Sequence, residues 1–377
     1  MPWNEVPMSE LRVAFVRLVD SLHFSVAHAC REFGISRKTG YKWLRRARQQ
    51  PQQPLTDLSR RPHTSPGRTA DDLEKQILEV RDRYGWGGRK IRAFLRQHGV
   101  ATPSRQTVQR VLSRCGRVCP RTTPPPTPLA FERALPNELW QLDFKGPIEV
   151  EHQRVFPFAI VDDHSRYLLA LHACLDCTMQ SAWDVLWQAF ADAGLPEAIL
   201  ADNGFGTRGQ NGLGLSWFEA QLVRLHIHPY HGRPYHPQTQ GKVERFNGTL
   251  QRELWPRIRR DQLGHFQADL THWRTTVYNV LRPHEALGDL PPVQRWRPSP
   301  RQRPNRLPQV VYDSGAMVRK VMNRGDISYR GYRILVGAGL EGEYVRIEER
   351  DHELAIFYAW KEVRCLPNAA LRHQGIL

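Results

Sequence analysis

The chain has 377 residues and a formal net charge of +16. This length suits two to four domains, and the charge favours an anionic polymer as the partner. No uninterrupted apolar run approaches membrane-spanning length, and six cysteines do not form a disulfide framework in a chain this long, which excludes a membrane-spanning protein and a small disulfide-rich secreted one.

The N-terminal segment, residues 1–13, lacks the basic start, apolar stretch and cleavage site of a signal peptide. We therefore expect a cytoplasmic bacterial protein, nucleoid-associated when it is bound to DNA, with no membrane and no disulfide-linked partner. The CxxC of Cys174 and Cys177 and the CxxxC of Cys115 and Cys119 lack a second pair at a good spacing. We interpret them as plain thiols and not as zinc ligands.

Charge is distributed unevenly along the chain. Residues 1–130 carry a net charge of +14, residues 131–290 carry −4 and residues 291–377 carry +6. This pattern is expected when the N- and C-terminal parts of the chain bind phosphate groups and the middle part binds cations.

The first motif, residues 25–49, has the pattern of a helix-turn-helix. Ser25 and Ser36 stand where N-caps are required, and Gly34 supplies the turn. Gly40 within the second helix is unfavourable by about 1 kcal/mol relative to Ala. A solvated basic helix in a helical bundle is the alternative interpretation. If the motif binds DNA, the predicted contacts are Arg37, Lys38, Lys42, Arg45 and Arg46.

A second, weaker helix-turn-helix pattern covers three short amphipathic segments at residues 70–85, 87–99 and 104–116. Its predicted DNA contacts are Arg89, Lys90 and Arg105. Five prolines between residues 120 and 128 then indicate an extended, semi-rigid spacer.

The middle of the chain alternates strand and helix patterns typical of a mixed α/β sheet. A strand near residue 143, a hairpin over 154–175, a helix over 179–194 and a short strand ending at 202 are followed by a helix and a further strand. Asp162 and Asp163 lie at the hairpin turn, and we interpret them as turn formers.

Three acids come from separate elements of this region. Asp143 lies in the first strand, Asp202 at the end of a later strand and Glu244 just inside a helix that follows a loop-like run. Gathered together they would repel one another unless divalent cations lay between them, and oxygen-only ligands favour Mg²⁺ or Mn²⁺. Singly, each acid also fits an ordinary role as a strand, turn or helix-start residue.

The motifs QLDF, ADNG and HPQTQGKVERFNGTL resemble those of DDE-type insertion-sequence transposases with a retroviral-integrase-like core. The resemblance implies an RNase H-like core with Asp143, Asp202 and Glu244 as catalytic and metal-binding residues. It implies two Mg²⁺ ions, which Mn²⁺ may replace, and DNA cleavage followed by 3′-hydroxyl strand transfer. It also implies a homo-oligomer, dimer or higher, on element ends and target DNA.

Two features depart from that family pattern. The interval from Asp202 to Glu244 is long, with its excess in the glycine-rich residues 204–216, and Gln251 stands where a basic residue is common. The further predicted DNA contacts are Arg233, Lys242, Gln251 and Arg252.

The last part of the chain consists of short strand patterns, which predict a small antiparallel SH3-like barrel. The fold expected is therefore multidomain: helix-turn-helix modules at 1–50 and 69–118, an α/β RNase H-like core at 131–290 and a β-barrel at 309–367, with linkers at 51–68, 119–130 and 291–308. Two other functions stay open: a catalytically inactive, transposase-derived DNA-binding regulator, and an RNase H-like nuclease.

Overall fold

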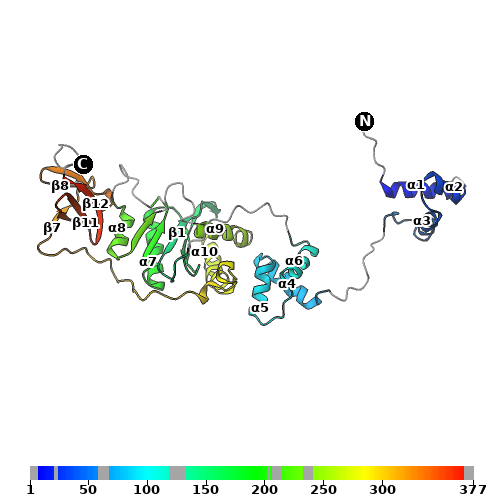
Figure 1. Cartoon of the computed structure of the whole chain (residues 1–377), viewed down its shortest axis with the longest axis horizontal. Helices are drawn as coiled ribbons and strands as arrows, with labels where there is room; N and C mark the ends of the chain where they lie inside the picture. The colour runs from blue at the N-terminus through cyan, green and yellow to red at the C-terminus, as the bar shows by residue number, and fades with distance from the viewer. Residues whose placement is uncertain are drawn as a thin grey trace, which may run out of the picture. The chain divides into compact units, whose positions relative to one another are not determined.

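The computed structural model describes residues 7–20, 24–57, 68–118, 132–202, 204–205, 214–231 and 241–368. The chain divides into two compact units, residues 1–68 and residues 69–377 (Figure 1).

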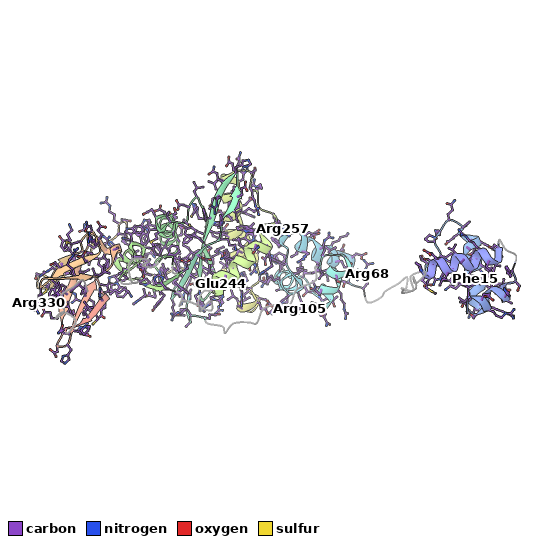
Figure 2. The ribbon with its side chains drawn as sticks, turned by 90° about the horizontal axis from the view of Figure 1, so that it is seen from above. Phe15, Arg68, Arg105, Glu244, Arg257 and Arg330 are labelled. Atoms are coloured by element: carbon purple, nitrogen blue, oxygen red, sulfur yellow. The ribbon has the colours of Figure 1, made fainter. Side chains whose placement is uncertain are left out.

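The first unit consists of three helices: α1 (Met8–Asp20), α2 (Val26–Glu32) and α3 (Arg37–Gln49). Its small core gathers around Phe15, which is labelled in Figure 2. The predicted caps are present, because the hydroxyls of Ser25 and Ser36 accept backbone N–H groups at the starts of α2 and α3. Gly40 has a packing reason: a Cβ there would lie 2.5 Å from Cys30 Sγ and 2.9 Å from the ring of Phe15. The glycine lets α3 approach the other two helices closely.

The second unit begins with another set of three helices: α4 (Asp71–Tyr84), α5 (Gly88–Gln97) and α6 (Arg105–Arg114). We call these the second helical module. Gly85 ends α4 in the left-handed conformation, and the Ser104 hydroxyl caps α6. Its buried aliphatic side chains belong to the same hydrophobic cluster as those of the sheet region that follows. The module is therefore packed directly on the core.

The core is built on a mixed sheet. Its strands are β1 (Trp140–Phe144), β2 (Ile148–Val150), β3 (Gln153–Asp162), β4 (Leu168–Cys174), β5 (Ala198–Ala201) and β6 (His228–His231). β3 pairs antiparallel with β1, β2 and β4, while β1–β5 and β5–β6 are parallel. The order β2-β3-β1-β5-β6 places β1 at the centre.

Helices cover both faces of this sheet. Alternation along β3 sends Phe158 and Ile160 to one face and Ala159 and Val161 to the other. The first face packs against α7 (Met179–Ala193) and α8 (Trp217–Arg224). The second packs against α9 (Gly241–Glu253), α10 (Leu263–His272) and the π-helical segment η3 (Trp273–Leu281). The short 3-10 helices η4 (Glu285–Leu287) and η5 (Pro292–Gln294) follow.

The C-terminal part is an open sheet and not the barrel that we predicted. The four strands β7 (Met317–Lys320), β10 (Tyr344–Glu349), β11 (Glu353–Tyr358) and β12 (Lys361–Pro367) pair in the order β12-β11-β10-β7, and the outer two do not meet. β8 (Asp326–Tyr329) and β9 (Tyr332–Leu335) form a separate two-stranded ribbon.

The core supplies the cover that a closed barrel would otherwise provide. Leu215, Ala220 and Val223 join the hydrophobic cluster of the C-terminal strands, and Trp360 Nε1 donates to the Val223 carbonyl at 2.8 Å. The short helix η6 (Ala338–Leu340) lies against the start of α8. Because α8 buries the apolar face, the sheet is shielded without closing on itself.

Across the described ranges, no helix has the length and apolar character needed to cross a membrane.

Candidate active site and nucleic-acid interface

The strand pattern places two of the three predicted acids on one face of the sheet. Leu142 and Ala201 pack on the α7 and α8 face. Because side chains alternate along a strand, Asp143 and Asp202 belong to the opposite face, which α9 covers. β1 and β5 are parallel neighbours with Gln141 beside Leu200. Continuing that register by two residues brings Asp143 level with Asp202 at the carboxyl ends of both strands, where ligands gather in open α/β sheets.

The third acid comes from the helix on that face. Val243, Phe246 and Leu250 are buried at helical spacing and fix which side of α9 meets the sheet. Glu244 lies in the first turn and is exposed. Figure 2 shows its position on α9. One turn later, Asn247 Nδ2 donates to Asp143 Oδ2 at 2.8 Å. Sequence reasoning did not single out Asn247.

The electrostatics of Asp143 connect all three acids. The pKa of Asp143 is raised to about 6. Burial raises it most, and the charges of Asp202 and Glu244 add to that effect, while the Asn247 hydrogen bond and the charge of Lys145 lower it. Asp202 acts on Asp143 more strongly than Glu244 does. A carboxyl group held near others in this way favours either a proton or a cation beside it.

The donor chemistry fits a hard divalent cation, since all three groups offer oxygen. However, no group of three or more His, Cys, Asp or Glu side chains among the described residues is placed to hold a metal ion. Glu244 therefore does not complete a three-acid shell in this conformation. Residues 232–240, directly before α9, lie outside the described residues, together with the predicted contact Arg233.

The backbone at Asp202 is held by contacts of His231. His231 ends β6, its Nε2 lies 2.7 Å from Glu219 Oε1, and its Nδ1 lies 3.3 Å from the Asp202 carbonyl. The hydrogen bond with Glu219 raises the pKa of His231 against the opposing effect of burial. The imidazole thus links β6, α8 and the end of β5, next to the acid.

The hairpin-turn aspartates do more than form the turn. Asp162 accepts from the Ser165 backbone and hydroxyl, as a turn former does. Asp163 is fully buried, accepts from Gln141 and pairs with Lys242 at the start of α9. Lys242, a predicted DNA contact, is therefore committed to an internal ion pair.

A buried ionic cluster at the other end of α9 joins it to the second helical module. Glu253 receives hydrogen bonds from Trp86 Nε1 at 3.0 Å, Lys90 Nζ at 2.6 Å and Arg282 Nε at 2.8 Å. Burial by itself would raise the pKa of Glu253, but the charges and hydrogen bonds of Arg282 and Lys90 prevail and lower it to about 2. Lys90, another predicted DNA contact, faces this cluster and not solvent.

The predicted contacts of the first unit divide into two groups. Arg37, Lys38 and Arg45 are exposed on α3. Lys42 and Arg46 lie 4.8 and 5.5 Å from the ring of the buried Trp43, so their charges also stabilise an aromatic side chain.

The remaining predicted contacts are on the second unit. Arg105 is exposed at the first position of α6, and Arg89 pairs with Asp289 and Glu285. Gln251 is exposed two turns after Glu244. The Arg252 guanidinium lies back along α9 over Gly248, which has no side chain to obstruct it. The DNA-contact assignments stay predictions.

Family comparisons agree with this arrangement. Residues 133–237 and 225–292 each match an integrase core domain family. Residues 11–63 match a helix-turn-helix domain family, and residues 39–112 match a homeodomain-like family. These matches define the class: a helix-turn-helix region followed by an integrase core.

Known relatives fall into two groups. A putative transposase for insertion sequence element IS5376 from Geobacillus stearothermophilus is 24% identical over 90% of this chain and 83% of its own length. A Gag-Pro-Pol polyprotein from squirrel monkey retrovirus is 32% identical over 43% of this chain. An insertion element IS476 protein from Xanthomonas euvesicatoria is 28% identical over the same share. The chain spans only 8% of that polyprotein and 44% of the IS476 protein.

Solved structures with some likeness include a simian T-cell lymphotropic virus intasome with a PP2A regulatory subunit. It is 20% identical, with a TM-score of 0.36, over 77% of this chain and 96% of that chain. The HTLV-2 integrase catalytic core domain in complex with magnesium is 21% identical, with a TM-score of 0.31, over 43% of this chain and 97% of that chain.

The chain thus contains an integrase core domain with N-terminal helix-turn-helix domains, and it is distantly homologous to insertion-element transposases and retroviral integrases. Members of the integrase catalytic core family are generally DDE polynucleotidyl transferases.

Proposed function

We propose that the chain is a transposase that binds the ends of an insertion element, cleaves there and transfers the resulting 3′-hydroxyl end into target DNA. Asp143, Asp202 and Glu244 are the proposed metal-holding acids. The observation that carries this proposal is that two carboxylates from other elements, Asp202 directly after β5 and Glu244 in the first turn of α9, both raise the pKa of Asp143 in β1.

Magnesium ions, or manganese in their place, bound by these carboxylates would polarise the scissile phosphodiester. The chain's own residues do the positioning. Asn247 holds one oxygen of Asp143 and leaves the other for a ligand. His231 fixes the backbone at Asp202. The exposed basic residues of α3 and α6 hold DNA, and a homo-oligomer assembles on the paired ends.

One alternative has an observation in its favour. Because the described acids do not form a three-ligand group, a DNA-binding regulator with an idle core is the second candidate. Gln251, in place of a basic residue, points the same way. An RNase H-like nuclease that cuts without joining is distinguished by its products.

A strand-transfer assay with Mg²⁺ tests the proposal, with duplexes copied from the two ends of the element that carries the gene as substrate and a plasmid as target. Asp202→Asn runs beside the wild type, with Asp192→Asn of the exposed face of α7 as the matched control. Joined product from the wild type and the control, and none from Asp202→Asn, is the expected result. Binding without cutting would favour the regulator, and cut but unjoined product would favour the nuclease.

A further inference from the structure

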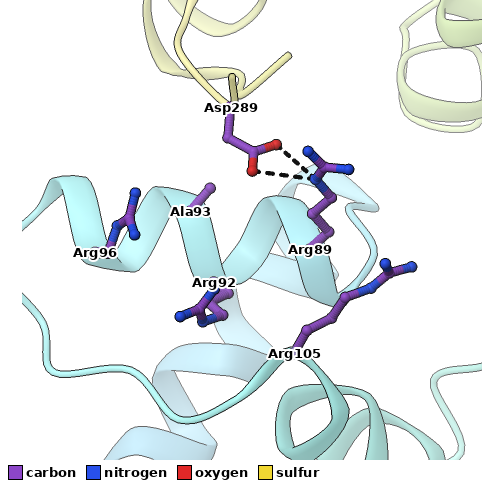
Figure 3. A pocket seen from close by; sticks show the side chains of 6 residues that line it. All are labelled: Arg89, Arg92, Ala93, Arg96, Arg105 and Asp289. Atoms are coloured by element: carbon purple, nitrogen blue, oxygen red, sulfur yellow. Dashed lines mark hydrogen bonds and ion pairs between the residues drawn. The ribbon is translucent and has the colours of Figure 1, made fainter. Parts of the chain in front are cut away.

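A basic pocket lies where the second helical module meets the core (Figure 3). Three arginines spaced three and four residues apart share one side of α5, a fourth opens α6, and the core contributes one aspartate. The lining consists of Arg89, Arg92, Ala93, Arg96, Arg105 and Asp289.

The positive charge of this pocket is only partly neutralised. Arg89 Nε donates to both carboxylate oxygens of Asp289, at 2.9 and 3.2 Å, and its Nη1 pairs with Glu285. Arg92 Nε donates to the neutral Pro103 carbonyl at 3.0 Å. No contact with an acid is found for Arg96 or Arg105 within the part of the chain that the structure describes. Four guanidinium groups therefore face a single lining carboxylate.

The size of the pocket and the chemistry of its lining residues both favour a phosphate group as the ligand. At about 290 Å³ the pocket lies at the small end of ligand pockets. Four of its six lining residues are arginines, and a guanidinium group matches the paired oxygens of a phosphate. The N-terminus of α6 adds the positive end of a helix dipole beside Arg105. Ala93 is the single apolar residue in the lining, so there is little surface on which a base would stack.

We propose that this pocket binds one backbone phosphate of duplex DNA, and that Asp289 and Glu285 of the core hold Arg89 until the phosphate replaces them. The inference rests on the proposed function, because it assumes that DNA is the partner. It extends that function in two ways. It adds Arg92 and Arg96 to the proposed DNA contacts, and it assigns Asp289 and Glu285 of the core to compete with DNA for Arg89 of the second helical module.

The geometry supports competition between the acids and DNA. The Arg89 side chain is about one-third exposed, and the Glu285 side chain is 75% exposed, so both are reachable from solvent. An exposed pair of this kind contributes little stability. A phosphate that also contacts Arg96 and Arg105 gains more partners than the two acids supply.

Fluorescence anisotropy of a labelled element-end duplex, measured over a salt series in EDTA, tests the proposal without depending on catalysis. Arg96→Gln and Arg105→Gln are each expected to weaken binding, and together to reduce the slope of log affinity against log salt by about 0.9, because the two arginines share one phosphate. Arg83→Gln, an exposed arginine of α4 outside the pocket, is the matched control and should change the slope by much less. Wild-type affinity and slope in both pocket variants would overturn the proposal.

Competition is tested by Asp289→Asn, compared with Glu79→Gln, which removes one exposed negative charge from α4. Asp289→Asn should bind the duplex about two- to tenfold more tightly than Glu79→Gln, because Arg89 is released. If Asp289→Asn does not fold, Glu285→Gln at the exposed end of the same ion pair takes its place. Equal affinity in the acid variant and the control would overturn the competition.

Two further outcomes separate the possible failures. A wild-type protein that binds no duplex would contradict the proposed function itself, whereas wild-type binding that is unchanged in the arginine variants contradicts only the pocket. The last experiment measures the binding of a fluorescent ATP analogue to the wild type and to the arginine variants. Tight ATP binding that disappears in Arg96→Gln and Arg105→Gln, while duplex affinity stays the same, would assign the pocket to free nucleotide and overturn the DNA assignment.

Discussion

At the residue scale, the proposed site depends on how each carboxyl group is held. Asp143 is more than half buried and receives one hydrogen bond from Asn247, whereas Glu244 is exposed at the start of α9. The three acids are therefore unequal. Asp143 lies within β1 and Asp202 directly follows β5, whereas Glu244 belongs to α9.

Asn247→Ala should slow strand joining by about 10–100-fold, the usual effect of removing a group that orients a metal ligand. Without this donor the pKa of Asp143 rises further, so the residual activity should shift to higher pH, where the carboxyl group ionises. The measurement is a pH profile of single-turnover joining, together with duplex affinity. A lower rate with an unchanged profile would indicate a general packing defect instead.

At the element scale, α9 carries two functions at its two ends. Its start presents Glu244, and its last residue, Glu253, is locked to the second helical module through Lys90 and Trp86 and to the core through Arg282. The cluster therefore joins the helix of the proposed active site to the module that is predicted to read DNA.

Glu253→Gln should lower the free energy of unfolding by about 3–5 kcal/mol at neutral pH, because it leaves Lys90 and Arg282 buried without their counter-charge. The pKa of Glu253 is lowered from 4.5 to about 2 in the fold. Its stabilisation is thus complete above pH 4.5 and disappears as the pH falls toward 2. Urea unfolding at neutral and acidic pH measures this, with Glu79→Gln as the control. A difference that persists unchanged in acid would contradict the ionic explanation.

Local patterns in the sequence predicted helices and strands well, but they did not predict contacts between distant residues. The strands β1 and β5, the helix α9 and the capped starts of α2, α3 and α6 follow such patterns, and each is present. The contact between Trp86 and Glu253 joins residues 167 positions apart, and no local pattern encodes it. The open C-terminal sheet was missed for the same reason, since its cover comes from α8. The acids themselves were identified from their joint resemblance to a family, and their role as metal ligands stays a prediction.

At the scale of the whole molecule, the division into two units separates α1–α3, which are proposed to bind DNA, from the unit that holds the core. The second helical module belongs to that unit, because its hydrophobic side chains are buried with those of the core and its half-buried Lys90 pairs with Glu253. The two helical regions therefore differ: one forms a compact unit of its own, and the other belongs to the unit that contains the integrase core.

A fragment of residues 69–377 should fold without the first unit and melt within about 2 °C of the corresponding transition in the full chain. Its binding to element-end DNA should depend less on salt, with a slope smaller by about 0.9 for each phosphate that the first unit neutralises. Calorimetry and anisotropy on both proteins measure this. A fragment that fails to fold, while the isolated residues 1–68 also fail, would show that the two units depend on each other.

The most direct test of the central claim is the joining activity of Glu244→Gln in Mg²⁺, since Glu244 is the exposed acid and the one least constrained by the sheet. Glu79→Gln serves as the matched control, and duplex affinity is measured for both. The account predicts that Glu244→Gln binds element-end DNA like the wild type and forms no joined product, while the control joins normally. Joining by Glu244→Gln at the wild-type rate would contradict the claim that three acids form one reaction centre.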